Sequence, residues 1–364
     1  MIFAPSVALL TDTFPRQERG RAIGLNAVAV SIGVSAGPAL GGIITEHLSW
    51  RWIFFLNLPI GLLAVLASAR WLPRGTRKPE RFDPLGALLL ALGLAGLTLA
   101  LSFGQEWGWL SVPVLACVAA AVFSLAALVV VERRVEQSNL DLGLFRRRAF
   151  SAALASLVLS FVALFAVSFL MPFYLENLRG FPPERSGLLL TPLSLAIGLV
   201  APLSGTLADR VGSRWLASVG LALACVGLFW LSQVNATTSV LDIVWRLVLV
   251  GAGTGMFQSP NNRALMQAAP GGGQGEASGV LGTGRVVGQS LSVAVAGAVF
   301  AALGGMEANT RLSAQASGAP VPQEQVAALQ QAFVTGFHVA LLVCACVAAA
   351  GVLTSLVRAE PERA

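Results

Sequence analysis

Residues 111–131 read SVPVLACVAAAVFSLAALVVV, a stretch without a single charged side chain. A helix needs about 20 mostly apolar residues to cross the roughly 30 Å hydrocarbon core of a bilayer. Similar blocks recur along the 364 residues, which are 55% hydrophobic and only 12% charged, with a mean hydropathy of +0.75. An average soluble domain carries about 25% charged residues. The sequence therefore predicts an all-α polytopic membrane helical bundle.

Ten full membrane spans are predicted by a hydropathy window of about 19 residues. They cover residues 21–44, 52–72, 84–103, 111–131, 150–175, 185–208, 215–232, 240–258, 279–303 and 334–357. Met1–Leu10 is apolar but half as long, and it lacks the basic region and cleavage site of a signal peptide. We expect it to be the end of an eleventh span. The polar stretch Gly304–Ala332 is predicted to be an external loop with a short helix at 323–332.

The positive charges are distributed unevenly between alternate loops. Of the 24 Lys and Arg residues, 18 fall in one set of loops and span ends. Positive residues are retained on the cytoplasmic side, so we expect a multi-pass protein of the cell inner membrane with a cytoplasmic C-terminus. The arginines lie between apolar blocks and not on one amphipathic face, so the net charge of +6 predicts contact with the lipid bilayer and no nucleic-acid partner.

The residue types that carry most enzyme chemistry are sparse. The four cysteines lie inside apolar blocks and the two histidines stand apart from each other, which leaves no zinc spacing. No nucleophile is paired with a base, and no phosphate-cradling loop follows a strand. The sequence predicts no metal, no cofactor, no catalytic residue and no enzymatic activity, and it makes no prediction of oligomeric state.

A glycine motif marks the predicted span 21–44, whose second half reads GVSAGPALGG over residues 33–42. Gly33, Gly37 and Gly41 recur every four residues and share one helix face, which allows another helix to approach closely. Pro38 removes a backbone hydrogen bond and introduces a kink. One interpretation is an ordinary helix-dimerisation face of small residues. The order of glycine, proline and the paired Gly41 and Gly42 permits a more specific one.

This string resembles the antiporter motif of drug exporters in the major facilitator superfamily. Its flanks, TDTFPRQERGRAIGL and GGIITEHLSWRWIFFLNLPIG, resemble the fourteen-span drug:proton antiporter branch. The resemblance covers nearly the whole chain and implies the major facilitator fold, in which the motif helix seals one face of a central cavity. It also implies that the chain lacks the first spans, where relatives carry the acidic proton site, and the 364-residue chain is then expected to be inactive alone.

The resemblance also implies a division into three parts. Residues 1–72 would end the N-terminal helical bundle, residues 73–149 would form a linker with two extra spans, and residues 150–364 would form the C-terminal six-helix bundle. The spans 84–103 and 111–131, which carry no recognisable motif, resemble the two helices that the fourteen-span branch inserts between its halves.

A second motif, GTLADRVGSR at 205–214, lies in a short turn predicted to be cytoplasmic. Its glycines and charges suit a simple tight turn. The string is also similar to the second copy of the superfamily's loop motif, which implies a charge latch that holds the cytoplasmic side shut. Ser213 departs from that motif, because a basic residue is usual there. The candidate latch residues are Gly205, Asp209, Arg210, Gly212 and Arg214.

Two groups of side chains are candidates for the substrate cavity. Phe161, Phe165, Phe169 and Phe173 repeat every four residues and form an aromatic stripe, which suits a flat or cationic drug but also suits contact with lipid or a neighbouring helix. The polar group Gln258, Asn261 and Asn262 lies at the inner end of another span, where it lines the cavity or is solvated at the membrane interface.

Three charged residues fall inside predicted spans, where burial is costly. Asp242 and Arg246 lie four residues apart, so they either form a structural ion pair or act in a proton relay. Arg285 lies about two turns into its span, where its side chain can extend toward the cytoplasmic surface.

Together these features predict an efflux transporter. It would export small, hydrophobic or cationic drugs in exchange for protons by alternating access. An uptake carrier of the same superfamily is one alternative, and a non-transporting scaffold or an inactive remnant of a truncated gene is another.

Overall fold

The computed structural model describes residues 33, 36–71, 84–132, 143–268, 274–316 and 322–357. Within these ranges the chain is helical and contains no strand. Residues 36–47 form a helix, here called the glycine helix, that carries most of the glycine motif. The labelled elements are α3 (Arg51–Trp71), α4 (Pro84–Trp107), α5 (Val112–Glu132), α6 (Gly143–Arg146), α7 (Arg148–Phe173), the π-helix η1 (Tyr174–Leu178), α8 (Pro183–Val211), α9 (Ser213–Leu231), α10 (Val240–Ala268), α11 (Gln274–Ala302), α12 (Gly305–Ala316) and α13 (Gln323–Val357).

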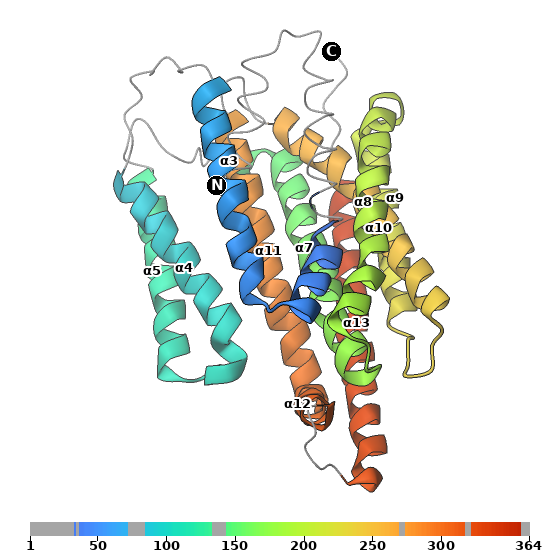
Figure 1. Ribbon diagram of the computed structural model, residues 1–364. Helices are drawn as coiled ribbons and strands as arrows, with labels where there is room; N and C mark the ends of the chain where they lie inside the picture. The colour runs from blue at the N-terminus through green and yellow to red at the C-terminus, as the bar shows by residue number, and fades with distance from the viewer. Residues whose placement is uncertain are drawn as a thin grey trace.

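The long helices run roughly along one common direction (Figure 1). Nine described helices are long and apolar enough to cross a membrane, which confirms the predicted helical bundle. Helices are the natural solution here, because a helix satisfies its backbone hydrogen bonds internally where lipid offers no partners. The predicted span 21–44 lies mostly outside the described residues, as does the partial span Met1–Leu10.

Several helices extend beyond the predicted spans. α10 continues to Ala268, ten residues past the predicted end, and α13 begins at Gln323. Polar residues lower the hydropathy of these ends without breaking the helix. The predicted separate helix at 323–332 is therefore wrong, since these residues are the first turns of one 35-residue helix.

A second correction concerns the predicted loop at 304–332. Residues Gly305–Ala316 form α12, which Figure 1 shows nearly end-on at the tip of the bundle, beyond the lower end of α11. This helix is amphipathic: Ala308, Asn309 and Leu312 are buried, whereas Glu307 and Arg311 form an exposed ion pair at 2.7 Å. Its polar composition hid it from a search for membrane spans.

Two groups of helices make up the main bundle. α10 packs between α8 and α9, while α7 packs against α11 and α13, and α13 joins the groups through α9. Helix ends are tied as well, since the guanidinium of Arg147 donates a 3.3 Å hydrogen bond to the carbonyl of Ala268 at the end of α10. The buried core runs through all of these helices.

The predicted inserts α4 and α5 pack on each other, and α4 also contacts α11 (Figure 1). By contrast, no part of the most apolar stretch of α3 is buried against the described residues. The division at residues 72 and 149 remains a prediction.

Glycines allow unusually close packing around α10. A Cβ atom at Gly255 would lie 2.7 Å from the carbonyl oxygen of Ile197 in α8. A Cβ atom at Gly253 would overlap the backbone of Ala224 in α9. Two faces of α10 therefore stand in backbone contact with two neighbours, the geometry that small residues permit in membrane helices.

Candidate functional site

The glycine helix packs against the first turns of α8. A Cβ atom added to Gly187 would overlap the carbonyl oxygen of Pro38, and one added to Gly42 would overlap the carbonyl oxygen of Pro183. One turn further, Nε2 of His47 lies 3.1 Å from a carboxylate oxygen of Glu184. Two glycines on opposite helices thus create a backbone-to-backbone contact, and a polar pair closes its end.

The predicted face of the motif is not the one used in this contact. No described atom lies within 4 Å of the Cβ positions of Gly33, Gly37 or Gly41. The contact instead uses Pro38 and Gly42. The four-residue spacing identified the helix correctly. Gly187, which packs against Pro38 and Gly42, lies 145 positions after Gly42 and belongs to no sequence pattern that would pair it with this helix.

The second motif covers the end of α8 and the start of α9. Only Gly212 lies between the two helices. Gly212 has φ +96°, a conformation that side chains rarely adopt, so glycine permits the abrupt reversal. Gly205 has a different role, because a Cβ atom there would lie 2.7 Å from Oγ of Ser259 in α10.

The charged residues of this motif are placed as follows. Arg210 is exposed. The guanidinium carbon of Arg214 lies 5.9 Å from the ring centre of Trp215, and its Nε is buried without a hydrogen-bond partner among the described residues. The side chain of Asp209 lies outside the described residues. The latch role of the motif remains a proposal.

The aromatic stripe on α7 is divided between two environments. Phe169 and Phe173 meet edge to face at 5.4 Å and pack against the buried core. Phe165 is half-buried. Phe161 faces α11, where the guanidinium carbon of Arg285 lies 5.3 Å from its ring centre. The stripe does not present four equivalent rings to one cavity.

The polar group on α10 lies inside the helix, since α10 runs on to Ala268. Asn261 is fully buried and donates a 3.1 Å hydrogen bond to the carbonyl of Ala153, which links α10 to α7. Oδ1 of Asn262 is buried without a partner among the described residues. Gln258 is half-buried one turn earlier.

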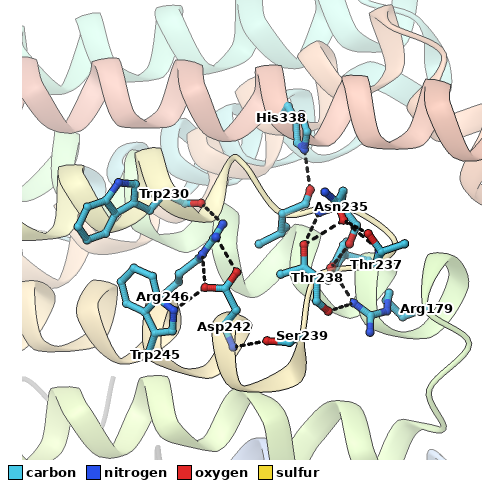
Figure 2. A network of polar contacts seen from close by, with 12 residues as sticks. Arg179, Trp230, Asn235, Thr237, Thr238, Ser239, Asp242, Trp245, Arg246 and His338 are labelled. Carbon is cyan, nitrogen blue, oxygen red and sulfur yellow. Dashed lines mark hydrogen bonds and ion pairs between the residues drawn. The ribbon is translucent and has the colours of Figure 1, made fainter.

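Asp242 and Arg246 form an ion pair near the start of α10. Nη2 of Arg246 lies 2.7 Å from Oδ2 of Asp242, and Nη1 donates a 2.6 Å hydrogen bond to the carbonyl of Trp230 in α9. Trp245 also donates to Asp242, at 2.5 Å. Figure 2 shows this pair beside the α9–α10 loop. The carboxylate is thus held by two donors, which favours a structural role for the pair.

A polar cluster that the sequence did not reveal surrounds the same loop (Figure 2). Arg179, directly after η1, donates a 2.5 Å hydrogen bond to the carbonyl of Thr238. His338 of α13 contacts the carbonyl of Val234 at 2.6 Å. Tyr174 donates to the carbonyl of Asn235 at 2.7 Å. The loop between α9 and α10 is therefore tied to η1 and to α13, and only its Asn, Thr and Ser residues hint at this in the sequence.

A further contact missed by the sequence analysis holds α12. Nδ2 of Asn177 in η1 donates a 2.7 Å hydrogen bond to Oδ1 of the buried Asn309. Since η1 begins two residues after Pro172, this amide pair links α12 to the segment in which α7 continues as a π-helix.

Comparisons with known proteins agree on the family. The family model described as "Major Facilitator Superfamily" matches residues 1–293. The chain is 35% identical over 299 residues to the uncharacterized transporter YebQ of Escherichia coli, covering 81% of this chain and 65% of that one. It is 34% identical over 299 residues to the multidrug resistance protein Stp of Mycobacterium tuberculosis, covering 82% and 56%. The riboflavin transporter RibZ of Clostridioides difficile is 33% identical over 304 residues, covering 83% and 65%.

The fold has solved counterparts. A bacterial homologue of the human lysosomal transporter Spinster, inward-facing and unoccupied, superposes with a TM-score of 0.57 at 16% identity, covering 97% of this chain and 73% of that chain. The alignments with the three sequence relatives span 56–65% of those relatives' own length. Two of these relatives are named as transporters and one as a multidrug resistance protein, so the family is one of transporters rather than enzymes, and the chain is a multi-pass membrane protein of that family. With a helical bundle, a family model that matches most of its length and relatives at about one-third identity, the chain belongs to the Major Facilitator Superfamily.

Proposed function

We propose that the chain forms part of an efflux transporter of the cell inner membrane. It exports small hydrophobic drugs in exchange for protons by alternating access, with its C-terminus in the cytoplasm. The name of one relative, a multidrug resistance protein, supports drugs as the substrate class. The arginine-rich loops support the orientation.

The observation that carries this proposal is the contact between the glycine helix and α8. Gly42 and Gly187 bring two backbones together at the outer ends of two helices. Backbone contact leaves no space for water or ions at this point, and we infer that it seals the two helices against each other while alternating access moves them as units. A seal of this kind favours tightly coupled exchange over leak.

In this proposal the Asp242–Arg246 ion pair on α10 takes no part in proton coupling. Asp242 is held by Arg246 and Trp245, so protonation would break both contacts. We assign Asp242 a structural role in positioning the α9–α10 loop.

Vesicle transport tests the proposal directly. The protein is produced from its own gene with the DNA upstream of the Met1 codon retained, and inverted membrane vesicles are energised to acidify their interior. Addition of a hydrophobic drug should dissipate the pH gradient, reported by a quenched acridine dye, and vesicles without the protein should show no response. The variant Gly187→Leu should lose the response, whereas Gly41→Ala should keep it.

The same experiment separates the alternatives. Drug accumulation that is faster in right-side-out than in inverted vesicles would indicate an uptake carrier and contradict export. An absence of transport in both orientations, with protein present in the membrane, would favour a non-transporting scaffold.

A further inference from the structure

Arg285 and Phe161 form a cation–π contact between the middle parts of α11 and α7. Phe161 lies at the midpoint of α7, and Arg285 is about 16 Å along the 29-residue α11, at a rise of about 1.5 Å per residue. Their guanidinium and ring lie 5.3 Å apart. Transporters of this architecture bind substrate near the midplane. The pair therefore lies at the depth where substrate is expected.

Close packing between α7 and α11 fixes the position of this pair. A Cβ atom added to Gly288 would lie 2.7 Å from Cβ of Phe161, and one added to Gly284 would lie 2.9 Å from Leu154. Since α7 and α11 cannot approach further, the Phe161 ring and the Arg285 guanidinium are held at the same level along the two helices. Arg285 lies at the edge of this contact between α7 and α11, next to Gly284.

Arg285 has no counterion within the part of the chain that the structure describes. Its Nε is buried without a hydrogen-bond partner, and the side chain forms no hydrogen bond or ion pair with any described residue. A guanidinium stays charged in proteins and offers five N–H donors in a planar fork. An aromatic ring face offsets only part of the cost of holding that charge inside a membrane. The fork is therefore suited to an anionic partner.

A second polar group on α11 also lacks a partner. Ser292 lies seven residues after Arg285, about two turns further along a similar face, and its buried hydroxyl has no partner among the described residues. Phe161 in turn has its ring face next to Arg285, so this ring is a poor site for a cationic drug.

We propose that Arg285, held on Phe161, binds a carboxylate or similar anionic group of the transported molecule, so that the transporter selects anionic over cationic amphiphiles. This inference rests on the proposed function and adds the charge type of its substrate. A carboxylate accepts two parallel hydrogen bonds from one guanidinium, which gives orientation as well as affinity. The aromatic ring holds the fork in place before substrate arrives.

Two dyes of opposite charge test the proposal. Fluorescein and rhodamine 6G share a flat xanthene ring, but fluorescein is anionic and rhodamine 6G is cationic. Their binding to the purified protein, produced from its own gene with the upstream DNA retained and placed in lipid nanodiscs, is measured by fluorescence anisotropy. Fluorescein should bind at least about tenfold more tightly than rhodamine 6G. The variant Arg285→Gln should weaken fluorescein binding about tenfold or more and leave rhodamine binding unchanged or stronger.

Matched variants make the result specific. Arg311→Gln removes the same charge at an exposed position of α12 and should leave both dyes unaffected. Arg285→Lys keeps the charge without the planar fork and should weaken fluorescein binding several-fold. If Arg285→Gln fails to fold, as judged by thermal melting, Arg285→Lys carries the comparison.

Several results would overturn the proposal. These are equal binding of the two dyes, binding of neither, or fluorescein binding that Arg285 variants leave unchanged. The last would show that the Arg285 guanidinium does not contact the bound dye. Binding is measured without a proton gradient, so failure of proton-coupled export leaves this inference standing. Drug export that persists without Arg285-dependent binding would overturn this inference alone.

Discussion

Gly187 of α8 lies so close to the carbonyl group of Pro38 that a methyl group at position 187 would overlap it. The relationship links the first turns of α8 to the glycine helix by backbone atoms alone. Backbone cannot move aside as a flexible side chain does, so the contact tolerates no larger residue.

We expect Gly187→Ala to lower stability by about 1–3 kcal/mol, the usual cost of overpacking. Thermal unfolding in detergent measures this, and vesicle transport should fall in parallel. Gly41→Ala is the control, since no described atom lies within 4 Å of its Cβ position. Alanine favours helix by roughly 0.5–1 kcal/mol over glycine, so the control should be neutral or slightly stabilised. Equal melting of the two variants would contradict the backbone contact.

The glycines of α10 should be equally intolerant. Gly253→Ala places a methyl group into the backbone of Ala224 in α9 and is expected to destabilise the protein by about 1–3 kcal/mol. Gly282→Ala in α11 meets nothing within 4 Å and should not destabilise. Parallel melting curves give the comparison. A Gly253 variant as stable as the Gly282 variant would show that α9 and α10 separate easily.

The ion pair on α10 should be worth more than its surface counterpart. Arg246→Ala removes the 2.7 Å pair with Asp242 and the donor to Trp230, and side chains here are only 15% and 32% exposed. We expect a loss of about 1–3 kcal/mol. The Glu307–Arg311 pair has the same spacing and distance but is 67% and 52% exposed, so Arg311→Ala should cost about 0–1 kcal/mol.

A double-mutant cycle tests whether the two groups act together. The double variant Asp242→Ala with Arg246→Ala should cost less than the sum of the single variants, because each single variant leaves one charge unpaired. Strict additivity in thermal unfolding would mean that the pair contributes no coupling energy.

The amide pair between η1 and α12 should hold α12 in place. Asn309→Ala removes the acceptor of the 2.7 Å hydrogen bond from Asn177. We expect faster amide hydrogen exchange across α12, by about tenfold if a hydrogen bond of about 1–1.5 kcal/mol is lost. Thr310→Ala changes the adjacent, exposed residue and should leave exchange unchanged. Protection of α12 that survives Asn309→Ala would place its anchoring in the apolar contacts of Leu312.

The positions of the spans were predictable because apolar blocks of membrane length have few other uses. Their ends were not, because residues such as Gln258 to Ala268 continue α10 with polar side chains that lower the hydropathy. α12 was missed for the same reason, since its apolar residues cover only one side.

The candidate site was predictable as a set of helices but not as a set of contacts. Spacing identified the glycine helix, yet Gly42 and Gly187 meet only in three dimensions. The charge of Arg285 was visible in the sequence, but its placement on Phe161 depends on how Gly284 and Gly288 pack on α7. Contacts between residues more than a hundred positions apart leave no local pattern.

The backbone contacts on both faces of α10 hold it closely against α8 and α9, so we expect the three helices to move as one unit. The glycine helix contacts one end of this unit at Gly187, and the one-residue turn at Gly212 lies at the other end. Over the 29 residues of α8, about 43 Å at 1.5 Å per residue, a tilt of about 10° moves the far end by about 7 Å. In the proposed alternating access, a small tilt about the Pro38 contact would therefore displace the Gly212 end far enough to open a path for a small molecule.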